Sequence, residues 1–307
     1  MSSPIAVDEG RSARVGCHVC GTPLRSVRRS RQWQIDVGQC PDCGTVSAIG
    51  ATEIVAADLA GVGSESEETD WDVYSQSMHT KEDVRNEVLD GLRQRAATGC
   101  HPPTLFDVGA GTGAFLDMAR SRGFRIAGND ISSSAIAHAA ERYGVQLSPD
   151  DLADQQARSV DAITMWCVIA HVGDPSAFLA DAHRMLRPGG VLFLRTPRWC
   201  AVDAAAAAVA RATRGRVAKL SDQRVTRGHL HLYRDQGMRR MLTDLGFVDV
   251  EVRPVAHTGC TGAEIVSRLG GPRGLQRWSS RAIDRAMASG KAPRNTMFVY
   301  ARRPSEG

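Results

Sequence analysis

The chain contains few lysines and no long apolar run. Of its 38 basic residues, three are lysine and the other 35 are arginine. The net charge of +4 is small, so the arginine bias does not by itself indicate nucleic-acid binding. No stretch approaches the roughly 18 consecutive apolar residues of a membrane helix. The segment 1–14 has no apolar core of the kind found in secretory signal peptides, so we expect a cytoplasmic location. We also expect this segment to be disordered, and we expect no membrane partner.

The composition is that of a globular protein. Hydrophobic residues make up 42% and charged residues 23% of the 307 positions. This length allows one sizeable domain and a smaller module. The eight cysteines, without an apparent secretory signal, argue against a disulfide framework and raise the possibility of a metal site.

Four of the cysteines have the spacing of a zinc site. Cys17 and Cys20 form one C-x-x-C pair, Cys40 and Cys43 form a second, and 19 residues separate the pairs. Four thiolates complete a tetrahedron and leave no position for water, which favours a structural Zn²⁺ over a catalytic one. The alternative is a redox-active C-x-x-C pair. We predict a zinc ribbon over residues 15–50 that needs the metal in order to fold.

The remainder of the chain predicts an α/β domain. Glycine, serine and acidic residues without periodicity mark residues 51–70 as a linker. Strands and helices then alternate, which is typical of a Rossmann-like, mostly parallel sheet. We expect strands at 104–108, 124–129, 160–166, 191–196, 247–252 and 297–302, and helices from 81, at 114–122, at 132–143, from 175 and at 235–246.

The stretch FDVGAGTGAF at 106–115 fits two glycine patterns. Gly109, Gly111 and Ala114 match the dinucleotide pattern G-x-G-x-x-G/A, whereas the stretch also reads D-x-G-x-G-x-G from Asp107. Asp130 ends the next strand, where a carboxylate can accept from a ribose diol in either case. Asp107 would repel a pyrophosphate but suits a ligand with an ammonium group, which favours the second pattern.

Together with this stretch, GNDIS, VDAITMWCVIAHVGDP and LRPGGVLFLRTP resemble the class I S-adenosylmethionine-dependent methyltransferases. The resemblance covers residues 71–303 and implies a seven-stranded, mostly parallel sheet with a substrate-cap insertion at about 200–233. Some members of this family also carry an N-terminal four-cysteine zinc ribbon.

The resemblance implies a set of cofactor contacts. Asp107 would face the ammonium group of S-adenosylmethionine, Asp130 the ribose hydroxyls and Ile131 the adenine ring. Asp150 and Asp151 both qualify as partners of the adenine amino group, and we favour Asp151. The full set is Tyr74, Asp107, Gly109, Ala110, Gly111, Gly113, Asp130, Ile131, Asp150, Asp151, Leu152, Trp166 and Cys167.

Three histidines are candidate catalytic residues. Methyl transfer mainly requires alignment of the acceptor with the methyl carbon, and a base is needed only for a protonated acceptor. His171 follows the fourth strand, and His229 and His231 lie two residues apart, so they would face one side of an extended segment. Each histidine has a packing or capping role as its alternative. Relatives often carry an acid at the position of Ala170, which weakens the case for His171.

The sequence leaves the methyl acceptor open. We expect a small molecule, methylated on oxygen, nitrogen or carbon, and a monomer or homodimer. Six basic residues between 200 and 233 would favour an anionic acceptor, or would form only a solvated helix face. The alternatives are an RNA methyltransferase that binds nucleic acid through the ribbon, and a non-catalytic cofactor-binding adaptor.

Overall fold

A computed structural model provides the coordinates. It describes residues 15–30, 35–49, 82–96, 102–216, 219–222, 224–225, 229–256, 280–282, 284–285, 289 and 293–306. The predicted N-terminal segment 1–14, the linker at 51–70 and Tyr74 lie outside the described residues.

The larger sheet contains six strands among the described residues, in the order β5-β4-β6-β7-β10-β9. Only β10 runs antiparallel to its neighbours. This is the expected α/β, mostly parallel arrangement. The strands are β4 (Thr104–Val108), β5 (Arg125–Asn129), β6 (Val160–Trp166), β7 (Leu186–Pro197), β9 (Val248–Val255) and β10 (Thr296–Arg302).

A seventh strand of this sheet is reduced to a single bridge. Asn129 forms an isolated parallel bridge with Ser148, at the outer side of β5. Pro149 follows directly and has no N–H to donate to a ladder. The prediction of seven strands is therefore corrected to six strands in the part of the chain that the structure describes.

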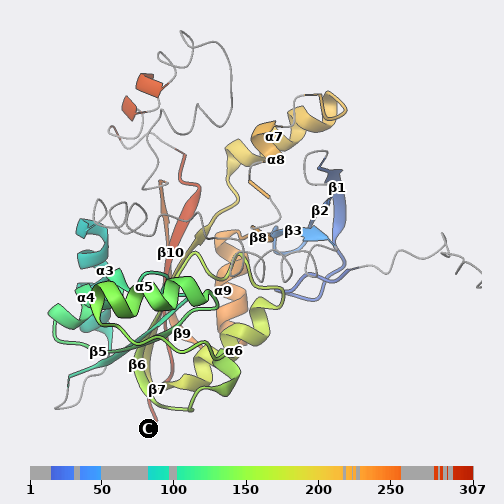
Figure 1. Cartoon of the computed structure of the whole chain (residues 1–307). Coiled ribbons are helices and arrows are strands. Elements are labelled where there is room, and N and C mark those ends of the chain that lie inside the picture. The colour runs from blue at the N-terminus through green and yellow to red at the C-terminus, as the bar shows by residue number, and fades with distance from the viewer. Residues whose placement is uncertain are drawn as a thin grey trace, which may run out of the picture.

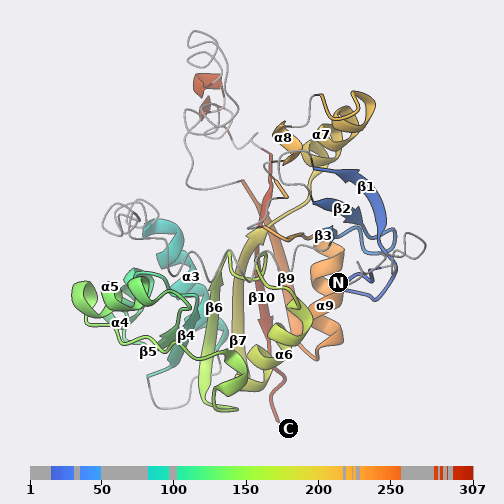
Figure 2. The ribbon, with the colours of Figure 1, turned by 45° about the vertical axis from the view of Figure 1, so that its right-hand side comes forward.

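Helices cover both faces of this sheet (Figure 2). Side chains of the strands alternate between the two faces, with Leu105 and Phe193 in one apolar cluster and Phe106 and Leu194 in the other. The first cluster includes α3 (Glu82–Arg95), α4 (Ala114–Ser121) and α5 (Ser133–Tyr143), and the second includes α6 (Pro175–Met185) and α9 (Asp235–Asp244). None of the described helices is long and apolar enough to span a membrane.

Several helix ends have the predicted caps. Ser132 accepts a hydrogen bond from the Ala135 amide at the start of α5, and Asp174 caps α6 through two amides. Pro175 occupies the first turn of α6, where its missing N–H leaves no hydrogen bond unmade. Strand β7 begins at Leu186, five residues earlier than predicted, because Arg187–Gly190 continues the strand instead of forming a separate turn.

The N-terminal module shares a sheet with the rest of the chain. Strands β1 (Arg25–Arg29), β2 (Asp36–Gln39) and β3 (Val46–Ile49) are antiparallel, and β3 also pairs with the short β8 (His231–Leu232) (Figure 1). In the cap region, α7 (Ala201–Ala212) and α8 (Lys219–Asp222) lie close to one another. The pairing of β3 with β8 fixes the module against the α/β domain.

His231 connects the two parts at this shared sheet. Its Nδ1 lies 3.0 Å from Ser47 Oγ and its Nε2 lies 3.1 Å from the Val172 carbonyl oxygen. Burial and the nearby His18 ring lower the pKa of His231 to about 3, against the partial opposition of the Val172 hydrogen bond. The buried ring therefore stays neutral in the folded protein.

The neutral ring predicts an acid-dependent loss of stability. Below pH 6.5 the unfolded chain takes up a proton at His231 that the folded chain does not accept until about pH 3, so the stability falls as the pH is lowered. Between pH 7 and pH 5 we expect His231 to account for about 2 kcal/mol of lost unfolding free energy. Urea titrations of wild type, His231→Gln and the α5 control His138→Gln measure this difference. Equal pH dependence in wild type and His231→Gln would contradict it.

Candidate functional site

The glycine loop turns the chain sharply at the carboxyl end of β4. Gly109, Gly111 and Gly113 all have positive φ, between 55° and 75°. At Gly113 a Cβ atom would lie 3.0 Å from Ala139 Cβ and 3.2 Å from Val145 Cβ, so a side chain is excluded by packing as well as by conformation. Gly109 is exposed and Ala110 and Gly111 are half-buried, so the backbone of this part of the loop is open to a ligand.

Two residues at the end of β5 hold this loop in place. Asp130 accepts hydrogen bonds from the Gly111 amide at 2.7 Å and the Ser132 amide at 2.9 Å. The buried Asn129 accepts from the Gly109 amide at 3.4 Å and donates to the Asp150 carbonyl at 2.8 Å. Asn129 thus connects the glycine loop with the loop after the single bridge. Asn129 was not predicted from the sequence, although it directly precedes Asp130.

Asp107 is buried beneath the glycine loop. Only 2% of its surface is exposed, and the Thr164 hydroxyl donates to its Oδ1 at 2.6 Å. Burial raises the pKa of Asp107 to about 7, while the Thr164 hydrogen bond and the Arg85 charge oppose this rise. Because the pKa of Asp107 is close to neutral pH, a positively charged ligand bound beside it would lower this pKa and favour the ionised carboxylate.

Arg85 is a second residue that sequence reasoning missed. It is a buried arginine on α3, and its guanidinium lies 5.6 Å from the centre of the Trp166 ring. The signal was present in the sequence, because Arg85 falls on the same helix face as the buried residues Leu89 and Leu92. A cation within such an apolar stripe indicates a specific partner.

The residues expected around an adenosine lie at the same edge of the sheet. Ile131 is 65% exposed, although it follows a buried strand, and this leaves an apolar surface beside Asp130. Asp151 caps the short helix η2 (Leu152–Asp154) through the Leu152 amide, and Asp150 is hydrogen-bonded to Ser148. Both acids are exposed at this edge. The structure does not distinguish between them as adenine partners.

Trp166 and Cys167 end β6 beside the glycine loop. The Trp166 ring packs against Phe115 and Phe193, with ring centres 5.1 Å away in each case. Cys167 has a φ of 69°, which is uncommon for a residue other than glycine. Burial raises the pKa of the Cys167 thiol, while the charges of Arg195 and Arg224 oppose the rise.

Cys167, His171 and His229 form one cluster. Cys167 Sγ lies 3.6 Å from His229 Nε2, and the rings of His171 and His229 are 4.8 Å apart between centres. One ligand atom from each of the three residues lies within 4.8 Å of the other two. His231, by contrast, uses both ring nitrogens in the contact with Ser47 and Val172. Both histidines thus contact the segment 167–172, but only His229 belongs to the cluster.

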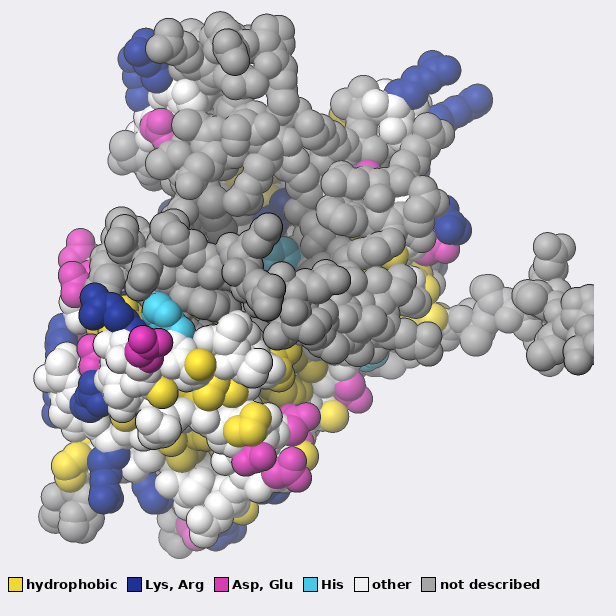
Figure 3. Space-filling model, in the orientation of Figure 1, with side chains coloured by type: hydrophobic (Ala, Val, Ile, Leu, Met, Phe, Trp, Pro, Cys, Tyr) yellow, Lys and Arg dark blue, Asp and Glu magenta, His cyan; other side chains and the backbone are white. Residues whose placement is uncertain are grey.

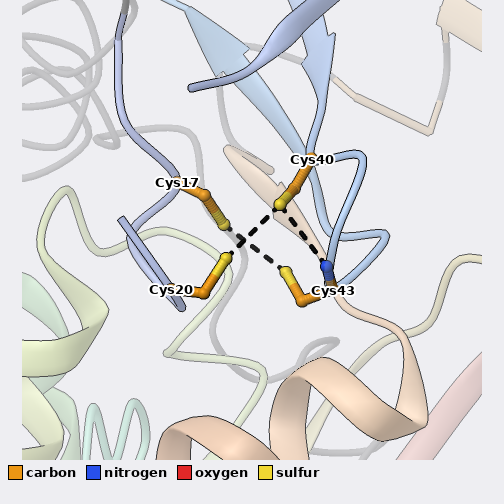
Figure 4. Close-up of side chains that lie close together, drawn as sticks. All are labelled: Cys17, Cys20, Cys40 and Cys43. Carbon is orange, nitrogen blue, oxygen red and sulfur yellow. Dashed lines mark hydrogen bonds between the residues drawn. The ribbon is translucent and has the colours of Figure 1, made fainter. Parts of the chain in front are cut away.

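The four N-terminal cysteines converge on one point (Figure 4). Sγ–Sγ distances are 3.5 Å between Cys17 and Cys43 and 3.4 Å between Cys20 and Cys40, well beyond the roughly 2.05 Å of a disulfide bond. The Val19 and Cys43 amides each donate to a cysteine sulfur at 3.4 Å. Four converging sulfurs with backbone amides directed at two of them are suited to bind a cation.

The basic residues of the cap region have different environments. Arg224 donates to the buried Asp203 at 2.8 Å, so its charge is compensated. Arg211, Arg214 and Arg216 are exposed near the end of α7, where Figure 3 shows dark-blue side chains standing out into solvent. These three arginines fit the solvated helix face that was the alternative to an anion-binding cap.

A hollow of about 530 Å³ lies away from the glycine loop. It is lined by Arg95, Glu251 and Tyr300 among others, and Arg95 and Glu251 form an ion pair of 2.7 Å. Val191, which also lines the hollow, pairs with Ala162 towards the amino end of β6. Ligands of parallel α/β sheets bind at the carboxyl ends of the strands, so this hollow is not the candidate site.

A protein-family model described as "Methyltransferase domain" matches residues 80–252, more than half of the chain. The chain belongs to this methyltransferase domain family. The match spans β4 to β9 and therefore contains the glycine loop, Asp130 and the Cys167 cluster.

Relatives of the methyltransferase domain match only parts of their own length. A Mycolicibacterium smegmatis protein named "Probable S-adenosylmethionine-dependent methyltransferase" is 33% identical over 107 residues, 34% of this chain and 42% of that protein. A ubiquinone biosynthesis O-methyltransferase from Pseudomonas syringae is 33% identical over 101 residues, 30% of this chain and 43% of that protein. The chain thus matches less than half the length of these two relatives.

A solved structure shares the fold. It is a complex between the Haloferax volcanii Trm112 methyltransferase activator and a methyltransferase, with a TM-score of 0.52 and 16% sequence identity. The match covers 78% of this chain and 97% of that chain. The α/β, Rossmann-like fold expected for a class I methyltransferase is therefore confirmed.

Asp107 predicts a proton-linked affinity for a cationic ligand. Because its pKa is about 7, Asp107 is mostly protonated at pH 6 and must release that proton to face an ammonium group. We expect the affinity for S-adenosylmethionine to fall about tenfold from pH 8 to pH 6. Calorimetry in buffers of different ionisation enthalpy measures both the affinity and the released proton.

Two variants isolate the contribution of Asp107. Asp107→Asn should bind S-adenosylmethionine more weakly than wild type does. Its affinity should change with pH only as far as the ligand's own amino group titrates. Asp117→Asn, on the exposed side of α4, should behave as wild type. Identical pH profiles for wild type and Asp107→Asn would rule out this role.

Proposed function

We propose that the protein transfers the methyl group of S-adenosylmethionine to a small-molecule acceptor. The observation that carries the proposal is the arrangement of Asp107, the glycine loop and Asp130 within a domain of the methyltransferase family. The names of both relatives support the cofactor or the acceptor class: one contains S-adenosylmethionine, and the other is an O-methyltransferase of ubiquinone biosynthesis.

The residues at the carboxyl ends of the strands fit the three parts of S-adenosylmethionine. The buried carboxyl of Asp107 suits the ammonium group, and the open glycine backbone suits the methionine part. Asp130 can exchange its hydrogen bond with the Gly111 amide for the ribose hydroxyls. The exposed Ile131 side chain can cover the adenine ring, which would remove its apolar surface from water.

The reaction needs alignment more than acid–base chemistry. The acceptor lone pair forms a bond to the methyl carbon while the carbon–sulfur bond breaks and its electron pair returns to sulfur. The sulfonium becomes a thioether, and an acceptor hydroxyl or ammonium also gives up one proton. His229 is the histidine that we propose for this proton, because it lies beside Cys167 just after β6, whereas His231 is buried between Ser47 and the Val172 carbonyl oxygen.

We also propose that the four-cysteine cluster binds a structural Zn²⁺. Tetrahedral Zn–S bonds of about 2.3 Å would place the sulfurs about 3.8 Å apart. The observed separations of 3.4 and 3.5 Å are close to this value, and two backbone amides point at sulfur. Four thiolates would leave no position for water or substrate. Zinc at this position would stabilise the module that pairs with β8.

Cofactor binding is the first test of the proposal. Calorimetric titration should give micromolar binding of S-adenosylmethionine and none of NAD. Asp130→Asn should weaken this binding about 10- to 100-fold, because a charged hydrogen-bond acceptor is lost. Asp90→Asn, at an exposed ion pair on α3, is the matched control and should bind as wild type. Binding of NAD alone would refute the proposed cofactor.

The acceptor class can be tested with labelled S-adenosylmethionine. Transfer of the labelled methyl group to members of a small-molecule panel, including carboxylates and phenols, would support the proposal. Transfer only to RNA, with the steep salt dependence of phosphate contacts, would contradict it.

Loss of zinc should affect turnover more than cofactor binding. Cys40→Ser should remove the ion from the ribbon and lower the melting temperature, because the cysteines share an apolar cluster with Met238 and Met241 of α9. Methyl transfer should fall at least about tenfold, since β8 directly follows His229 and Leu230. The affinity for S-adenosylmethionine should change less than about twofold. Cys200→Ser is the control, and a Cys40→Ser protein with normal zinc content would disprove the site.

A further inference from the structure

The cluster of Cys167, His171 and His229 combines three side chains that ligate transition metals. Cys167 directly follows β6, His171 lies in the next turn, and His229 belongs to the segment before β8. Their ligand atoms all lie within 4.8 Å of one another, and all three side chains are half-buried. The cluster is separate from the four N-terminal cysteines. With a metal ion bound, His229 would serve as a ligand and not as the proton acceptor proposed above, because the methyl acceptor would bind as an anion.

Hydrogen bonds fix the two segments that carry these side chains. The Leu230 and His231 amides donate to the Ala170 carbonyl at 2.7 and 3.3 Å. The Tyr233 hydroxyl donates to the Ile169 carbonyl at 3.2 Å. His231 adds its contact with the Val172 carbonyl oxygen at 3.1 Å. Hydrogen bonds between 169–172 and 230–233 thus hold the two segments together without using the ligand atoms of the cluster. The three side chains are therefore pre-organised.

The local geometry matches the requirements of a metal ion. Tetrahedral Zn²⁺ with Zn–S and Zn–N distances of about 2.3 and 2.0 Å places sulfur and nitrogen about 3.5 Å apart. The distance between Cys167 Sγ and His229 Nε2 is 3.6 Å. Cys167 also holds a φ of 69°, and such a backbone outlier at a ligand position indicates a functional constraint.

We propose that Cys167, His171 and His229 bind a second divalent transition metal ion, Zn²⁺ in the first instance. One thiolate and two imidazoles form a three-ligand set that leaves the fourth tetrahedral position open. A set of this kind differs from the closed four-cysteine cluster, in which every position is taken by protein.

The open position would take an anionic oxygen of the methyl acceptor, a statement that rests on the proposed function. The site lies beside the glycine loop, because a Cβ at Gly109 would be 2.8 Å from the Val168 side chain that follows Cys167. A divalent metal ion with one thiolate and two neutral imidazole ligands keeps a net positive charge, which favours a carboxylate, phenolate or enolate over a neutral acceptor.

The simpler alternative is a hydrogen bond between the Cys167 thiol and the His229 ring. It would explain the distance of 3.6 Å between them. Such a hydrogen bond gives no reason for the His171 ring to lie 4.8 Å from the His229 ring, measured between ring centres. The two possibilities predict different metal contents for the full chain, which makes them separable.

Metal stoichiometry of the full-length protein tests the proposal. After equilibration with Zn²⁺ and removal of free ion, elemental analysis should give about two zinc ions per chain in wild type. Cys167→Ala and His229→Ala should each retain about one. Titration of Co²⁺ into protein with a zinc-filled ribbon should also produce a thiolate-to-cobalt absorption band that Cys167→Ala lacks.

Matched variants keep the outcome interpretable. Cys200→Ala and His138→Ala replace a cysteine and a histidine outside the cluster and should retain both ions. Thermal unfolding and S-adenosylmethionine titration show whether each variant remains folded. One ion per chain in wild type at excess Zn²⁺, or two ions in the Cys167→Ala/His229→Ala double variant, would overturn the proposal. Failure of methyl transfer with both ions present would instead count against the proposed function.

Discussion

The turn that follows β4 constrains the rest of the site. Within five residues the chain leaves a buried strand, passes three glycines with positive φ and enters α4. Only glycine fits at position 113, because its φ is positive and because α5 and the following loop leave no room for a Cβ there. It places the open backbone of the loop directly above the buried Asp107. The neighbouring strand then supplies Asn129 and Asp130, which hold the loop through its amides.

The N-terminal module is coupled to this site through a shared strand. Because β3 pairs with β8, the module that holds the four cysteines adjoins the segment that contributes His229 to the Cys167 cluster. His231 reinforces the pairing with hydrogen bonds to both sides. A module of this size has little core of its own, and it obtains one by packing against Met238 and Met241 of α9. The N-terminal module is thus connected to the candidate site through the pairing of β3 with β8 and through its packing on α9.

Features set by local spacing were predictable from the sequence. The glycine loop, the acids at 107 and 130, the helix caps and the four-cysteine pattern each depend on residues close together in the chain. The structure confirms the α/β architecture and brings the four cysteines together. The pairing of β3 with β8, the separate surroundings of His229 and His231, and the partners of Arg85 depend on contacts between distant segments. No pattern of spacing encodes these contacts. The reduction of a seventh strand to a bridge before Pro149 was missed for another reason, because the number of strands was taken from the family resemblance and not from the local sequence.

The central claim is that the glycine loop holds an amino-acid sulfonium and not a pyrophosphate. A crystal structure of the protein with S-adenosylhomocysteine, the demethylated product, tests it most directly. We predict that the product's amino group will face Asp107, that its ribose hydroxyls will replace the Gly111 amide at Asp130, and that its adenine will cover Ile131. Product bound elsewhere, with Asp130 still hydrogen-bonded to Gly111, would contradict the claim.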